Sequence, residues 1–156
     1  MTTIITADQD AIVSEIDIAA PPERVFQALS TADQLKRWWT SPECPLDYWE
    51  MDARPKGRWQ FDTKPGSLSV NGVNEFHCHG EIVDYDPPRL LAYTWIANWH
   101  DDRSRRTVVR YDLTAEEGGT NIKVTHSGLA QETASRKGYA EGWPEVLEKL
   151  KQYVEH

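Results

Sequence analysis

Cysteine, basic residues and long hydrophobic runs are all scarce in this sequence. It has two cysteines, Cys44 and Cys78, and no CxxC motif, which excludes a disulfide framework, a zinc ribbon and a redox dithiol. Its 17 Lys and Arg against 25 Asp and Glu give a net charge of −8, which disfavours nucleic acids and anionic membranes as partners. No stretch approaches the roughly 18 apolar residues of a membrane span, and residues 1–10 have no basic region or long apolar run. We therefore expect no signal peptide and a cytoplasmic location.

The composition is typical of one globular domain. The chain has 156 residues, of which 39% are hydrophobic and 27% charged, and a chain of this length buries about two-thirds of its unfolded surface. We expect a flexible tail over residues 1–10 and a single domain over residues 11–156. Seven tryptophans are many for this size. Since exposing a large ring is costly, most of them should line a core or a pocket.

Hydrophobic periodicity predicts a strand, two short helices and then a series of strands. The first strand covers residues 11–18, and Pro21-Pro22 ends it and opens a helix. A second helix starts at Ala32 behind a capping box formed by Thr31 and Gln34. An Asn71-Gly72 pair marks a hairpin. The remaining strands are expected at residues 46–52, 57–63, 74–85, 89–95, 107–113 and 120–127.

The last segment is predicted to be a helix with one apolar face, formed by Trp143, Leu147, Leu150 and Val154. Pro144 either kinks a longer helix or lies near the start of the main one. The fold class is therefore α+β. A curved antiparallel sheet of about six or seven strands should wrap around this helix, with two short helices after the first strand.

Several short motifs, taken together, resemble a known superfamily. They occur in a fixed order at residues 20–26, 35–39, 52–59, 80–83, 87–95, 119–120, 125–129 and 142–143. This series is similar to the START-like helix-grip superfamily, also called SRPBCC or birch-pollen-allergen-like. The most similar branch is that of the C-terminal domain of the heat-shock-protein-90 ATPase activator (Aha-type). One departure is that Lys56-Gly57 stands where the family usually has Gly-Gly before the tryptophan.

The resemblance implies a largely apolar cavity between the sheet and the long helix. Relatives in the superfamily bind lipids, sterols, polyketides or plant hormones, and some catalyse cyclisations. It therefore implies, first, a domain that binds a small apolar or aromatic ligand. A second reading is a stress-linked, co-chaperone-like interaction module. It ranks lower because we expect a single domain here, whereas the eukaryotic activator carries an additional N-terminal domain. A cyclase-like enzyme ranks third, because no paired titratable groups are evident.

The candidate cavity-lining residues are those expected on the inward faces of the strands and the last helix. Their rings fit either a pocket wall or a filled aromatic core. His126 would either bond a ligand or act as an acid or base, or else be satisfied by a neighbour within the core. The set comprises Trp59, Phe61, Tyr93, Trp95, Tyr111, His126 and Trp143.

Two further clusters are weaker candidates. His77 and His79 share one face of a strand and would need a third ligand to hold a metal, so we expect no metal. We also expect no cofactor and no catalytic residue. Arg103, Arg105 and Arg106 form a basic run that either meets an acidic partner or is a solvated loop. The oligomeric state is left open.

Overall fold

The computed structural model describes residues 2–156, which form one antiparallel sheet and three helices. The spatial order of the strands is β1-β2-β8-β7-β6-β5-β4-β3. The helices are α1 (Pro22–Ser30), α2 (Ala32–Trp38) and α3 (Thr133–Glu155). The eight strands are β1 (Thr2–Ile5), β2 (Ile12–Ile18), β3 (Leu46–Met51), β4 (Arg58–Thr63), β5 (His77–Asp86), β6 (Leu90–Ala97), β7 (Thr107–Glu116) and β8 (Gly119–Ser127).

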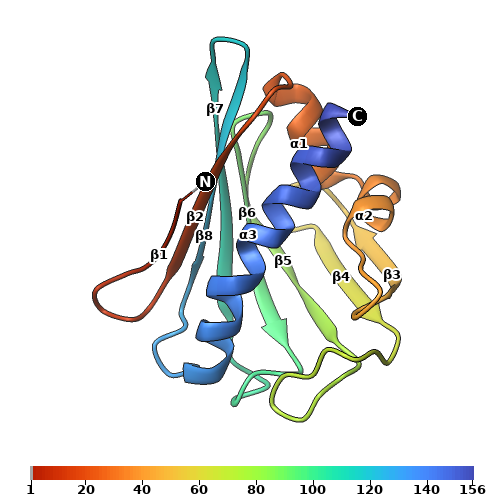
Figure 1. Ribbon diagram of the computed structural model, residues 1–156, viewed down its shortest axis with the longest axis vertical. Helices are drawn as coiled ribbons and strands as arrows, with labels where there is room; N and C mark the ends of the chain where they lie inside the picture. The colour runs from red at the N-terminus through yellow and green to blue at the C-terminus, as the bar shows by residue number, and fades with distance from the viewer. Residues whose placement is uncertain (1) are drawn as a thin grey trace.

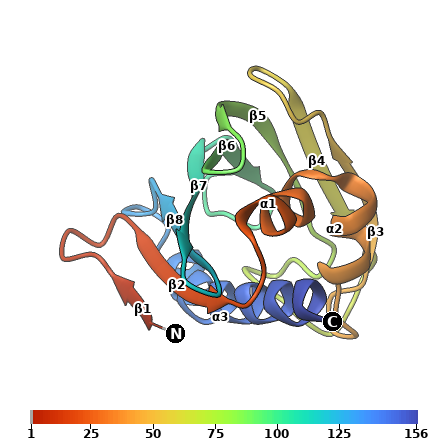
Figure 2. The same ribbon diagram turned by 90° about the horizontal axis from the view of Figure 1, so that it is seen from above.

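The sheet curves around the helices, which confirms the predicted α+β helix-grip arrangement. Figure 2 shows the strands as an arc, with α1 and α2 inside it and α3 running across its open side. In Figure 1, α3 crosses diagonally in front of the central strands. The apolar face of α3 is buried at Trp143, Leu147 and Leu150, as its periodicity predicts. Pro144 lies inside this 23-residue helix, so it does not mark the start of the helix.

The sheet has eight strands, slightly more than the six or seven expected. Residues expected to be a flexible tail contain β1, which pairs with β2 from Thr2 opposite Glu15 to Ile5 opposite Ile12. Two threonines and two isoleucines make this segment a favourable strand sequence. The polar composition of the first ten residues concealed it.

Two local predictions about the ends of elements were wrong. Helix α2 begins at Ala32 as expected, but in the described chain the Thr31 side chain makes no capping bond. Its backbone carbonyl instead accepts the N–H groups of Gln34 and Leu35. Strand β5 begins at His77 rather than at residue 74. Just before it, Phe76 donates its N–H to Thr63 Oγ1 and accepts the Thr63 N–H at its own carbonyl.

The Asn71-Gly72 hairpin is confirmed. Both residues have positive φ, 51° and 76°, and Val70 bridges Val73 across the turn. Positive φ at both central positions is the condition that favours an Asn-Gly pair. This hairpin sits in the loop between β4 and β5, at one end of the space between sheet and α3 (Figure 1).

Candidate functional site

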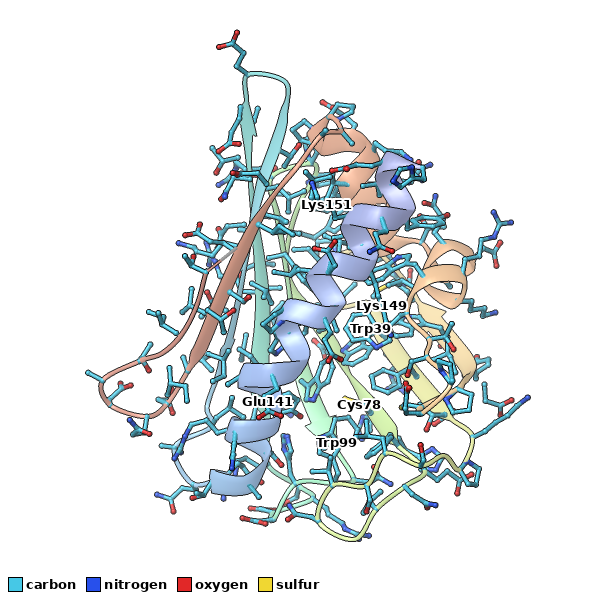
Figure 3. All side chains as sticks on the ribbon, viewed as in Figure 1. Trp39, Cys78, Trp99, Glu141, Lys149 and Lys151 are labelled. Carbon is cyan, nitrogen blue, oxygen red and sulfur yellow. The ribbon has the colours of Figure 1, made fainter. Side chains whose placement is uncertain are left out.

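A cavity of about 590 Å³ lies between the sheet and the first half of α3. This volume lies within the usual range of small-molecule sites. Its walls come from the segment between α2 and β3, which includes Trp39 and Cys44, from strands β3, β4 and β6, from the loop between β4 and β5, from Trp99 after β6, and from the helix residues between 134 and 146. Figure 3 shows two of the lining residues, Trp39 and Trp99, next to α3.

Aromatic rings form the sheet side of the cavity. The ring centroid of Trp39 lies 6.2 Å from that of Phe61 and 6.4 Å from that of Trp95. Trp99 continues the wall, 6.1 Å from Trp95. Phe76 closes it at 5.1 Å from Trp99. Such a surface favours apolar and ring-bearing ligands, because it offers area for burial and faces for stacking.

Alternation along β4 explains the position of Phe61. The side chains of Trp59, Phe61 and Thr63 share the buried face. Trp59 lies deeper, opposite Gly80 in the β4–β5 register, and donates its indole N–H to the carbonyl of Thr94 at 2.8 Å. A Cβ at position 80 would lie 1.9 Å from that carbonyl oxygen and 2.6 Å from the indole nitrogen, so only glycine fits beside this hydrogen bond.

The residues predicted to line the cavity divide into two groups. Phe61, Trp95 and Trp143 line it. The other four lie in the buried aromatic core next to it and are at most 2% exposed; they are Trp59, Tyr93, Tyr111 and His126. The ring centroids of Trp59 and Tyr93 are 4.6 Å apart, and the hydroxyls of Tyr93 and Tyr111 are 3.3 Å apart. Burial raises the pKa of both tyrosines above the usual value, so both stay protonated.

His126 is held in a chain of hydrogen bonds. Trp143 donates its indole N–H to His126 Nδ1 at 3.2 Å. Thr107 Oγ1 lies 2.8 Å from His126 Nε2 and donates its own proton to the carbonyl of Trp95 at 2.9 Å. Thr107 therefore accepts from a protonated Nε2, and both ring nitrogens are occupied. Burial holds the pKa of His126 well below its usual value, so the ring is neutral.

A second polar group lies at the end of the cavity near Trp99. Trp95 donates its indole N–H to the Tyr139 hydroxyl at 2.9 Å, and that hydroxyl lies 2.7 Å from His100 Nε2. Burial lowers the pKa of His100 and raises that of Tyr139 well above its usual value. Tyr139 is therefore a fixed polar contact in an otherwise aromatic wall.

Sequence reasoning did not select Trp39, Trp99 or Tyr139. Trp38 and Trp39 are adjacent in the sequence, and only their positions at the end of α2 separate them. Trp38 is buried and donates to the carbonyl of Ala28 at 3.0 Å. Trp39, just past the helix, lies against Trp49 with ring centroids 5.0 Å apart and lines the cavity.

Cys44 lies at the edge of the cavity and is half-buried, whereas Cys78 is 1% exposed. Burial raises the pKa of both thiols. A raised pKa leaves little thiolate at neutral pH, which makes Cys44 a slow nucleophile. The two cysteines therefore differ in access and not in protonation.

The two weaker clusters lie outside the cavity. His77 Nδ1 bonds Asp62 at 2.7 Å on an exposed strand face. Across residues 2–156, no three His, Cys, Asp or Glu side chains gather closely enough to hold a metal ion. Arg105 bonds the buried carboxylate of Glu132 at 2.8 Å, while Arg103 and Arg106 are exposed.

Glu132 fixes the loop between β6 and β7 to the start of α3. Besides Arg105, it accepts the backbone N–H groups of Asp101 and Asp102 at 2.6 and 3.1 Å. Burial raises the pKa of Glu132, but these donors lower it by more, so the net shift is downward. Of the three arginines in this run, Arg105 therefore has a structural role.

Comparisons with known proteins agree with the fold. Protein CV1439 from Chromobacterium violaceum is 22% identical, with a TM-score of 0.79, covering 94% of this chain and 99% of that one. Protein MLL2253 from Mesorhizobium loti is 26% identical, with a TM-score of 0.70 and coverage of 93% and 96%. An "AHSA1-like protein" from Aeromonas hydrophila is 22% identical, with a TM-score of 0.72 and coverage of 93% and 92%.

The sequence comparisons place the chain in a family. No curated protein matches it. Among its described residues, no helix is long and apolar enough to cross a membrane. The family model for "Activator of Hsp90 ATPase homolog 1-like protein" matches residues 19–155, which is most of the chain. The chain therefore belongs to the family of activator of Hsp90 ATPase homolog 1-like proteins.

Proposed function

We propose that this protein binds a small apolar, ring-bearing ligand in the cavity between its sheet and α3. The observation that carries the proposal is the cavity of about 590 Å³ with walls of Trp39, Phe61, Trp95 and Trp99. A filled aromatic core would leave no such volume, since protein interiors are close-packed. Because aromatic rings form the sheet side of the cavity, the site should accept several apolar ligands at micromolar affinity, roughly −8 kcal/mol.

The thiol of Cys44 offers a direct test, because it stands at the cavity and Cys78 does not. The protein is alkylated with N-ethylmaleimide with and without the aromatic ketone fluorenone, and the modified cysteine is counted by mass spectrometry. We expect fluorenone to slow alkylation of Cys44 at least fivefold and to quench tryptophan fluorescence. Cys78 should stay unmodified in both samples, which shows that the protein remained folded.

A pair of valines on α3 supplies matched variants. Val146 lines the cavity and Val154 does not, and both are half-buried. Val146→Trp should abolish the protection of Cys44, while Val154→Trp should retain it. If fluorenone and a panel of other apolar probes neither protect Cys44 nor quench fluorescence, the ligand-binding proposal is wrong.

Family membership supports a second candidate function, a co-chaperone-like interaction with an Hsp90-class chaperone. Within the run of three arginines, the exposed Arg103 and Arg106 are free to meet an acidic partner, since Arg105 is engaged by Glu132. Reversing both charges to Glu should then weaken chaperone binding at least tenfold and leave fluorenone binding unchanged. Equal chaperone binding by the variant and the wild type would remove this surface from consideration.

For either function we propose a cytoplasmic location, consistent with two free thiols in residues 2–156.

A further inference from the structure

Two glycines of α3 face the cavity at helical spacing. Gly138 and Gly142 are four residues apart, so they lie on one side of the helix, and both line the cavity. Within residues 2–156, a Cβ built at either position meets no atom within 4 Å beyond the neighbouring helix backbone. Packing within the chain therefore does not require glycine here. Alanine would make a more stable helix at both positions.

The two glycines leave a gap among the helix side chains that line the cavity, which include Tyr139, Trp143 and Val146. Opposite them stand the rings of the sheet side, with Trp39 and Trp99 on the cavity side of α3 in Figure 3. At these two positions the space is a slot, with aromatic rings on one side and helix backbone without a side chain on the other. A slot of this shape matches a planar ring system better than a globular or a flexible molecule.

A buried hydroxyl lies on the same side of the helix. Ser135, three residues before Gly138, lines the cavity and is 2% exposed. Its Oγ has no hydrogen-bond partner among residues 2–156. A buried hydroxyl without a partner is unfavourable. A ligand oxygen that accepted its proton would remove that cost.

We propose that the cavity selects planar, fused-ring ligands that carry a carbonyl or similar acceptor at one edge. The rings would lie between the aromatic wall and the face of Gly138 and Gly142, and the acceptor would receive the hydrogen bond of Ser135. This inference rests on the proposed function, because it names the class of ligand for the same cavity.

The test compares three ketones of different shape by calorimetry: planar fluorenone, globular adamantanone and flexible undecanone. The wild type should bind fluorenone at least tenfold more tightly than the other two.

Gly138→Leu and Gly142→Leu should each lower fluorenone affinity at least tenfold without lowering the Tm. Gln152→Leu, on an exposed part of the same helix, is the matched control and should bind as the wild type does. If a leucine variant fails to fold, Gly138→Ala and Gly142→Ala carry the test, with at least a threefold loss of affinity and a higher Tm.

The hydroxyl is tested with fluorene, which has the ring system of fluorenone without its carbonyl. The wild type should prefer fluorenone by about fivefold, the effect of one hydrogen bond. Ser135→Ala should remove this preference and leave fluorene affinity unchanged. A preference that persists in Ser135→Ala would overturn the assignment of Ser135.

The outcomes separate this inference from the function beneath it. If the wild type binds none of the probes, the proposed function itself fails. If it binds fluorenone but the glycine variants bind it within twofold of wild type, the slot is wrong and the cavity stands. Equal affinity for the three ketones would overturn the planar selection in the same way.

Discussion

The two halves of α3 serve different purposes in this protein. The second half is built for stability, because Leu147 and Leu150 are fully buried and Lys149 bonds the carbonyl of Thr40 at 2.9 Å. The first half contains Gly138, Gly142 and Pro144, all unfavourable in a helix interior, and it borders the cavity. One continuous helix therefore combines a packed segment with a segment that leaves space for something else.

Trp143 lies where these halves meet, and its removal should have the largest effect. It is 2% exposed, lines the cavity on one side and donates to His126 on the other. Trp143→Ala removes the buried ring, leaves a void and strips His126 of a donor, so we expect a loss of about 3–5 kcal/mol in the free energy of unfolding. Urea denaturation measures it. A Tm within a degree or two of wild type would show that the ring is not part of the core.

Truncating two neighbouring residues of α3, one in the core and one at the cavity, compares how tightly the two sides are packed. Leu147 is 0% exposed in the core, so Leu147→Ala should cost about 2–5 kcal/mol. Val146 is half-buried at the cavity, so Val146→Ala should cost about 1 kcal/mol or less. Both are measured by urea denaturation. Equal costs would mean that the cavity side is packed as tightly as the core side.

Two buried histidines, one in the core and one at the end of the cavity, should also give the protein a pH dependence. Burial lowers the pKa of His126 and of His100 in the folded state. Below about pH 6.5 the histidines of the unfolded state take up protons, whereas those of the folded state do not. The free energy of unfolding therefore decreases as the pH is lowered below this value. We expect a loss of up to about 1.4 kcal/mol per pH unit for each histidine between pH 6 and 5.

Urea denaturation near pH 7.5, 6 and 5 measures this slope. His126→Asn should be less stable at neutral pH. Its stability should depend less steeply on pH, because one of the two histidines no longer contributes to the slope. An unchanged slope would mean that His126 is protonated in the folded protein.

The smallest expected effect is a gain in stability from substitutions on the cavity side of α3. Gly138→Ala and Gly142→Ala place a methyl group in open space and favour the helix, so each should raise stability by about 1 kcal/mol. Thermal denaturation should show a Tm a few degrees higher. A lower Tm would show that the methyl group collides with the chain.

The fold was predictable because its signals are local and periodic. The buried face of α3 followed from the spacing of Trp143, Leu147 and Leu150, and the hairpin followed from Asn71-Gly72. The site was less accessible. Inward-facing rings in the core and in the cavity look alike in sequence, so nothing there separates Trp59 from Phe61. That separation depends on how far α3 stands from each strand, which is a property of tertiary packing.

Residues outside regular elements were missed for a related reason. Trp39 follows the end of α2 and Trp99 lies in a loop, where no periodicity tells which way a side chain points. The same holds for the capping of α2, where backbone bonds replaced the side-chain pair that the sequence offers.

The central claim, that the first half of α3 borders a binding site and the second half belongs to the core, is tested most directly by NMR. Fluorenone is titrated into the labelled protein, and the amide shifts are followed along α3. The account predicts large changes at Gly138, Gly142 and Trp143, and little change at Leu150 and beyond. Changes spread evenly along α3, or confined to the residues after Leu147, would contradict it.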